Sequence, residues 1–197
     1  MNERIVRAVY DNNTITVYQA FNKYIAQSAV EHQTFVSPPF KKERMTWIKP
    51  SFLWMMYRSG WAIKENQECI LAIKIKRLGL EWALQNSCLS HFDSSVHTSY
   101  ETWKKILKNS PVRIQWDPEK DIFLHPLNYR SIQIGLSDIA VERYVTDWIV
   151  QVDDITENCK HINQLINEGK INQAKDLLPQ EQIYPLPENI ALIVNAF

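Results

Sequence analysis

The sequence is poor in glycine and cysteine, and these shortages exclude several classes of protein. It has 4 glycines among 197 residues, and neither GxxxxGK[ST] nor GxGxxG occurs. The glycine-rich phosphate cradles of P-loop and Rossmann proteins are therefore excluded. Its three cysteines stand far apart without a CxxC pair, which argues against a zinc ribbon or a disulfide scaffold. The GxSxG elbow of hydrolases is also missing, so a Ser-His-Asp hydrolase is not expected.

The sequence also lacks an excess of positive or negative charge, and it has no long apolar run. The 22 basic and 22 acidic side chains give a formal net charge of zero, which does not favour a protein that coats duplex nucleic acid. No apolar stretch approaches the roughly 20 residues that span a bilayer. The opening "MNERIVRAVYD" has no apolar signal-peptide segment. We therefore expect a cytoplasmic protein without a membrane partner.

Aromatic and cationic side chains are concentrated in one segment, residues 38–61. Pro50 and Gly60 are placed as start and stop signals, so a helix is predicted over 50–60. Because this helix is apolar on every side, we expect it to be buried. A buried Arg58 then needs either a structural carboxylate or an anionic ligand. The sequence leaves both alternatives open: a core with an internal ion pair, or the wall of a pocket for an anionic, aromatic ligand.

The stretch 34–49 is predicted to be a loop that runs into the start of this helix. Its cations outnumber its acids, with Lys41, Lys42, Arg44 and Lys49 against Glu43. Backbone N–H groups at a helix start, with the Thr46 and Ser51 hydroxyls, suit a phosphate or carboxylate. Trp47 could stack on a base or a nicotinamide ring. The alternative is a solvated basic loop with Trp47 in the core.

The remaining pattern predicts an α+β protein. Short strands and helices do not alternate in the regular order that a parallel sheet requires. The expected strands are 4–10 and 14–20 as a hairpin, 69–76, 112–117, 122–127, 130–136 and 147–155. We predict a single domain with a mixed or antiparallel sheet of short strands. Residues 1–155 form its α+β core, and residues 156–197 form a helical C-terminal extension packed on the same domain.

Two further clusters of reactive side chains are interpreted as structural. "CLSHFDSSVH" contains Cys88, His91, Asp93 and His97, a set that could bind a metal or act as an acid–base pair. A loop histidine with a capping Asp93 is the favoured interpretation, so no metal site is predicted. In "RIQWDPEKD", the acids after Trp116 are interpreted as a charged turn opened by Pro118.

The segment "RMTWIKPSFLWMMYRSGW" also carries a family resemblance. Together with "RAVYD", "VYQA", "CLSHFD", "PVRIQWDPE" and "RSIQIGL", it resembles the domain-of-unknown-function 4291 family of microbial proteins. The resemblance covers the chain to about residue 155. It implies membership of an uncharacterised family and no particular activity.

A shorter resemblance implies an activity. "TITVYQAFNKYIAQSAVEHQTF" is similar to the opening of ADP-ribosyltransferase domains, in which a strand followed by a helix grips NAD. The resemblance places Tyr18 and Gln19 at the gripping positions, with Gln19 in place of the family's His or Arg. It implies an ADP-ribosyltransferase-like core and NAD as cofactor. It also implies a late glutamate that stabilises the oxocarbenium-like sugar, for which Glu119 and Glu142 are the candidates.

These observations lead to one leading hypothesis and two alternatives. The leading hypothesis is an NAD- or nucleotide-binding enzyme that transfers ADP-ribose to an unknown acceptor. Its pyrophosphate would be neutralised by Arg44, Lys49 and Arg58, its ring would stack on Trp47, and Gln19 would orient a ribose. The first alternative is a single-stranded nucleic-acid-binding module without catalysis. The second is a structural or interaction domain that uses its helical tail to bind a partner.

Overall fold

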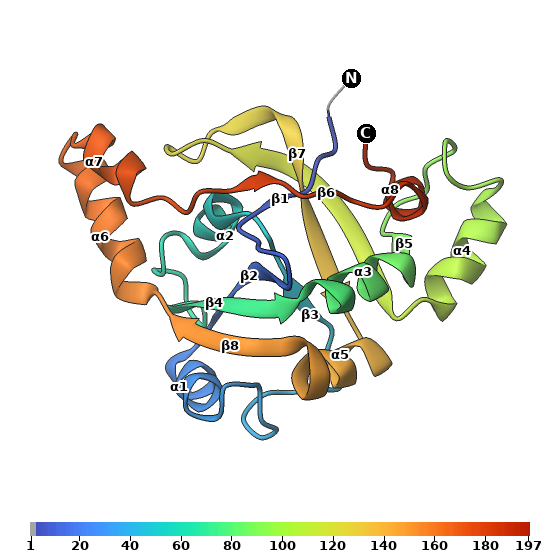
Figure 1. Cartoon of the computed structure of the whole chain (residues 1–197), viewed down its shortest axis with the longest axis horizontal. Coiled ribbons are helices and arrows are strands. Elements are labelled where there is room, and N and C mark those ends of the chain that lie inside the picture. Colours follow the sequence, from blue (N-terminus) through green and yellow to red (C-terminus); the bar gives the residue numbers. More distant parts are fainter. Residues whose placement is uncertain (1–2) are drawn as a thin grey trace.

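The computed structural model describes residues 3–197 and contains two main β-sheets (Figure 1). The three-stranded sheet is antiparallel throughout and has the order β2-β4-β8. Its strands are β2 (Thr14–Phe21), β4 (Cys69–Lys76) and β8 (Ile149–Asp154). β2 and β4 pair along their whole length, from Thr14 with Lys76 to Phe21 with Cys69.

The four-stranded sheet is mixed and has the order β3-β7-β6-β5. β3 and β6 are antiparallel to the central β7, whereas β5 runs parallel to β6. Its strands are β3 (Thr46–Ile48), β5 (Ser87–Leu89), β6 (Val112–Lys120) and β7 (Pro126–Leu136). A small pair, β1 (Arg7–Ala8) with β9 (Gln182–Ile183), joins the two ends of the chain.

Helices cover the sheets from several sides (Figure 1). α6 and α7 lie at one end of the molecule and α4 at the other, and α1 packs beside β8. None of the helices within residues 3–197 is long and apolar enough to cross a bilayer. The bounds are α1 (Lys23–His32), α2 (Phe52–Ser59), α3 (Arg77–Gln85), α4 (Tyr100–Asn109), α5 (Ile139–Arg143) with a π-helical turn (Tyr144–Trp148), α6 (Thr156–Asn167), α7 (Ile171–Asp176) and α8 (Glu188–Val194).

The core divides into two hydrophobic clusters because strands present alternate residues to opposite faces. On β2, Ile15 and Val17 enter the larger cluster, which also contains residues of β6, β7 and α3. Tyr18 points the other way, into a smaller cluster beneath α2 and α6. Both clusters are apolar, and their burial supplies the main driving force for folding.

The two main sheets meet at a backbone hydrogen-bonded pair between β2 and the residue that follows β3. The Tyr18 N–H donates to the Lys49 carbonyl at 2.7 Å, and the Lys49 N–H donates to the Tyr18 carbonyl at 3.3 Å. This antiparallel bridge fixes the end of β3 against the middle of β2. It therefore fixes the direction in which the Lys49 side chain leaves the junction.

Local signals in the sequence explain the bounds of α2. The Ser51 Oγ accepts a hydrogen bond from the Trp54 N–H at 3.1 Å, as an N-cap residue does. Gly60 ends the helix with a φ of 61°, a conformation that glycine adopts without strain, and its N–H donates to the Met56 carbonyl. The expected stop at Gly60 is thus confirmed, whereas the helix begins two residues after Pro50, with Ser51 as its cap.

The α+β class, the mixed sheet of short strands and the helical C-terminal segment are confirmed, but four local predictions are wrong. Residues 4–10 do not form a full hairpin with β2, because β1 pairs with β9 and only Tyr10 bridges to Ile15. The predicted loop 34–49 contains β3. The predicted strand 122–127 is mostly a turn, and the predicted charged turn after Trp116 is part of β6. Two of the errors concern β1 and β3, whose pairing partners β9 and β7 lie far away in the sequence. The other two concern the β6–β7 hairpin, in which β6 continues through Pro118 as far as Lys120, paired with Pro126.

The segment after residue 155 is packed into both hydrophobic clusters. α6 buries Cys159 and Ile162 in the cluster beneath α2, and α8 buries Ile190 and Val194 in the larger cluster. The indole N–H of Trp116 on β6 donates to the Val194 carbonyl at 2.7 Å. Removing this segment would expose apolar residues of both clusters to water.

We therefore predict that a chain truncated after Ile155 does not fold cooperatively. The deletion removes buried side chains from both clusters, and several such losses of about 2–5 kcal/mol each exceed the stability of a typical domain. Circular dichroism during heating checks this. A sharp transition near that of the full chain would contradict it and would make the tail an independent appendage.

Candidate functional site

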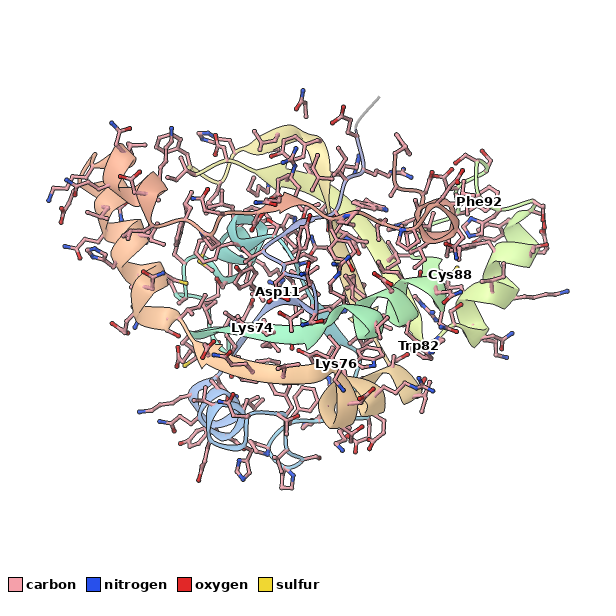
Figure 2. The ribbon with its side chains drawn as sticks, in the orientation of Figure 1. Asp11, Lys74, Lys76, Trp82, Cys88 and Phe92 are labelled. Carbon is pink, nitrogen blue, oxygen red and sulfur yellow. The ribbon has the colours of Figure 1, made fainter. Side chains whose placement is uncertain are left out.

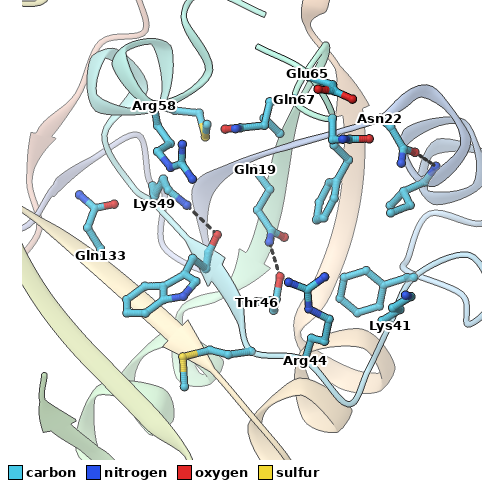
Figure 3. Close-up of a pocket in the computed structure, with 18 of the residues that line it drawn as sticks. Gln19, Asn22, Lys41, Arg44, Thr46, Lys49, Arg58, Glu65, Gln67 and Gln133 are labelled. Atoms are coloured by element: carbon cyan, nitrogen blue, oxygen red, sulfur yellow. Dashed lines mark hydrogen bonds between the residues drawn. The ribbon is translucent and has the colours of Figure 1, made fainter.

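A cavity of about 910 Å³ opens next to the junction of the two sheets. Its wall is built from the end of β2, the start of α1, the segment 39–49, α2, the segment 65–67 and one face of β6 and β7 (Figure 3). Four cationic side chains line it, namely Lys41, Arg44, Lys49 and Arg58, against the carboxylates of Glu65 and Asp117. The cavity therefore carries an excess of positive charge in a chain whose net charge is zero.

The floor of the cavity is one face of the four-stranded sheet. Gln115 on β6 is paired directly with Gln133 on β7. Ile48 at the end of β3 is paired with Ile134, so Lys49 comes next to Gln133 on the same face (Figure 3). Directly opposite side chains in an antiparallel pair are in contact range. Lys49, Gln133 and Gln115 thus form a row of polar side chains across three strands.

On the same face of the sheet, the next pair of residues contains a glycine that leaves room for a large side chain. Trp47 is paired with Gly135, and a Cβ atom on Gly135 would lie 2.9 Å from the Trp47 ring and 2.8 Å from the Met45 sulfur. The indole therefore lies across the glycine and forms part of the cavity wall. The sequence alone gave no reason to connect Gly135 with Trp47, because their pairing joins residues that are far apart in the chain.

Lys49 is the most deeply buried cation of the cavity, with 7 % of its surface exposed. Its amine donates to the Trp47 carbonyl at 2.9 Å, and it belongs to none of the ion pairs found among residues 3–197. Burial lowers the pKa of Lys49 to about 7, with a further lowering from Arg58 and an opposite effect from Asp117. An anion bound beside the amine would favour its charged form.

Arg58 lies on an exposed part of α2, which corrects the expectation that it is buried. The helix packs through Phe52, Met55 and Met56, so only one side of it enters the core. Trp54 and Arg58, four residues apart, lie on the same side of the helix and line the cavity. Arg58 was expected to be buried because Trp54 on this side of the helix is apolar. Trp54 contributes to the wall of the cavity and not to the core. Arg44 and Lys41 are exposed as well.

Gln19 lines the cavity but both ends of its amide are already bonded. Its Nε2 donates to the Thr46 Oγ1 at 2.6 Å, and the Tyr144 hydroxyl donates to its Oε1 at 2.8 Å. All three side chains are buried, and burial raises the pKa of Tyr144 well above its usual value. This network holds β2 against β3. The predicted contact of Gln19 with a ribose stays a prediction.

Two residues assigned to ligand binding lie outside the cavity lining. Tyr18 is buried in the smaller cluster, where its ring packs edge-on against Phe52 at a centroid distance of 5.5 Å. Ser51 caps α2 and donates to the Glu119 Oε1 at 2.8 Å. Their positions favour structural roles, because neither lines the space that a ligand would enter.

The two candidate catalytic glutamates also lie outside the cavity lining. Glu119 is buried, accepts hydrogen bonds from Ser51 and from the Lys120 N–H at 2.8 Å each, and has a pKa raised mainly by burial. Glu142 is exposed and lies 3.2 Å from the Lys42 amine. The carboxylate that lines the cavity floor is Asp117, whose two oxygens accept from the Gln115 Nε2 at 3.0 and 3.2 Å.

A β-bulge explains why Glu119 and Asp117 separate. Residues two apart on a regular strand share a face, and the spacing of these two acids would place both in the cavity. The register of β6 with β7 shifts between Pro118 and Lys120, and such a shift re-aims the side chains that follow it. The sequence offered Pro118 as the only sign of this irregularity.

The Cys88–His97 cluster lies at the α4 end of the molecule, near Phe92 (Figure 2). The Cys88 sulfur is 3.9 Å from the His97 Nε2, and burial raises the pKa of the thiol. Hydrogen bonds from Ser95 and Arg4 lower the pKa of Asp93 to about 2. Within residues 3–197, no three His, Cys, Asp or Glu side chains are grouped as a metal site would require.

The fold and the site together define an α+β protein with a basic, aromatic-walled cavity at the junction of two sheets. The chain belongs to the family described as "Domain of unknown function (DUF4291)", whose sequence model matches residues 5–184. The match confirms the family expected from the sequence and reaches beyond residue 155 to include β9. The comparison with curated proteins found no match, and the resemblance to ADP-ribosyltransferases has no support from these comparisons.

The first prediction from this geometry concerns the stability cost of Lys49. Because its folded pKa is about 7 and its ordinary value is 10.5, protonation disfavours the folded state. The cost is largest at and below pH 7 and disappears as the pH rises to 10.5. Lys49→Met should therefore stabilise the protein at pH 7, by on the order of 3 kcal/mol.

Chemical denaturation at pH 7 and pH 9.5 measures this difference, with exposed Lys105→Met as the matched control. The gain from Lys49→Met should be smaller at pH 9.5, and the control should change stability little at either pH. A loss of stability in Lys49→Met at pH 7 would show that the amine has a structural role.

The second prediction concerns the glycine beneath Trp47. Gly135→Ala places a methyl group where the indole and the Met45 sulfur now lie, so it should destabilise the protein by about 1–3 kcal/mol and alter tryptophan fluorescence. The double variant Gly135→Ala/Trp47→Leu should recover part of the loss, because the smaller side chain leaves room. Additive effects of the two substitutions would contradict direct contact.

Proposed function

We propose that the cavity binds a nucleotide with a pyrophosphate and an aromatic ring, such as NAD, and that the protein is an enzyme that acts on it. The observation that carries the proposal is the convergence of Arg44, Lys49 and Arg58 on one cavity. These cations come from the segment before α2 and from α2 itself. A local excess of positive charge in a neutral chain favours an anionic ligand.

Aromatic side chains and the size of the cavity support the same ligand class. Trp47 and Trp54 both line the wall, and indole rings bind aromatic rings by stacking. A volume of about 910 Å³ lies within the range of ligand sites. Arginine side chains suit phosphate oxygens because the guanidinium donates two parallel hydrogen bonds.

Transfer of ADP-ribose to an acceptor is the reaction we propose for this site. Breaking the bond between nicotinamide and ribose develops positive charge on the sugar, which a nearby carboxylate stabilises. Asp117 is the acid on the cavity floor and is oriented by Gln115. We therefore assign this role to Asp117, with Glu119 and Glu142 as the alternatives to be compared in the same assay.

Ligand binding is tested by thermal shift with NAD, ADP-ribose, ATP and single-stranded RNA at two salt concentrations. A ligand at about 100 times its Kd stabilises the native state by about 2.7 kcal/mol. We expect a shift with NAD or ADP-ribose that is lost in Arg44→Ala and kept in Lys105→Ala. A shift with RNA alone that fades with salt would favour the nucleic-acid-binding module, and no shift with any ligand would favour the interaction domain.

Release of nicotinamide from NAD tests the reaction. Asp117→Asn should lower the rate by about 100-fold or more, while Glu142→Gln should leave it unchanged because Glu142 is exposed outside the cavity. A loss in Glu119→Gln with Asp117→Asn unaffected would return the role to Glu119. Binding of NAD without release of nicotinamide by the wild type would limit the protein to nucleotide binding.

A further inference from the structure

The floor of the cavity contains a buried amide without hydrogen-bond partners. Gln133 is 2 % exposed, and neither its Nε2 nor its Oε1 has a partner. The indole Nε1 of Trp54 is also buried without a hydrogen-bond partner. Three of the four such side-chain atoms found among residues 3–197 thus belong to residues that line this one cavity.

Comparison with other glutamines of the same region shows that this condition is unusual. Gln19 is buried to a similar degree, and both ends of its amide are bonded. Gln115, the cross-strand neighbour of Gln133, donates to Asp117. Leaving a buried polar group unpaired costs about 1–3 kcal/mol. A ligand that pairs with Gln133 would recover this free energy on binding.

The position of Gln133 indicates which part of a nucleotide it would contact. Arg44 and Lys41 lie across the cavity from it (Figure 3), and both are exposed cations suited to phosphate. Gln133 lies between neutral Gln115 and Lys49 on the floor, with Trp47 in the neighbouring row. The Trp47 indole offers a surface on which a ring can stack. We therefore place the ring end of the nucleotide over Gln133 and Trp47, with the pyrophosphate on the far side of Lys49, toward Arg44.

An amide presents a donor and an acceptor side by side, so it pairs with a group that offers the complementary acceptor and donor. Such groups on nucleotides include the carboxamide of nicotinamide and the N6/N7 edge of adenine, which glutamine reads with two hydrogen bonds. We propose that Gln133 determines specificity by pairing with this amide-like edge of the ligand's ring. This inference rests on the nucleotide-binding function proposed above.

The test measures the affinity of the wild type and of Gln133→Leu for nicotinamide mononucleotide, AMP and inorganic pyrophosphate by titration calorimetry. Leucine keeps most of the side-chain volume and removes the donor and the acceptor. We expect affinity for one mononucleotide to fall by about 10- to 100-fold, while affinity for pyrophosphate stays the same. The nucleotide that is affected distinguishes a carboxamide from an adenine edge.

A second readout separates this role from a structural one. Because Gln133→Leu removes an unpaired buried amide, the variant without ligand should melt at a higher temperature than the wild type. Gln151→Leu, on β8 and outside the cavity lining, is the matched control and should leave all affinities unchanged. If Gln133→Leu does not fold, Gln133→Met offers the same test with an unbranched side chain.

The possible failures are distinguishable. Unchanged affinity of the Gln133 variant for both mononucleotides would overturn this inference and leave the proposed function standing. A wild type that binds neither mononucleotide nor pyrophosphate would overturn both. Equal weakening for all three ligands, pyrophosphate included, would show a general disturbance of the cavity and would also overturn the specificity role.

Discussion

The site depends on the backbone pair between Tyr18 and Lys49, where the two sheets are hydrogen-bonded to each other. Because side chains alternate between the two faces along each of these extended segments, the pair sets the direction of every nearby side chain. Tyr18 enters the smaller cluster, Gln19 reaches Thr46, and the Lys49 amine enters the cavity. A single bridge thus connects the packing of the core with the placement of the buried cation.

A polar network fixes the start of α2, the helix that supplies one wall of the cavity. The Glu181 Oε1 accepts from the Phe52 N–H at 2.7 Å, and Ser51 joins this end of the helix to Glu119. Burial, followed by the nearby Glu119, raises the pKa of Glu181 to about 8. The network orients α2 so that Trp54 and Arg58 face the cavity.

The site contains buried groups that lower the stability of the folded state. A buried amine with a pKa of about 7 and an unpaired buried amide on Gln133 both disfavour the folded state. Apolar side chains of equal size would pack there without these costs. Binding sites commonly retain such groups because the ligand completes their interactions. The apolar clusters on either side of the junction supply the stability that this arrangement requires.

The sequence by itself determined the α+β class, the end of α2 and the segment that supplies most of the cavity's cations and aromatic rings. These features are local: Gly60 ends a helix, and β-branched runs favour strands through their own stereochemistry. Only the tertiary structure decided which residues meet. The pairing of Trp47 with Gly135, the row that joins Lys49 to Gln133, and the bulge that separates Glu119 from Asp117 depend on strand register. Register is set by contacts between distant parts of the chain, and a shift of one residue reverses the face of every side chain that follows.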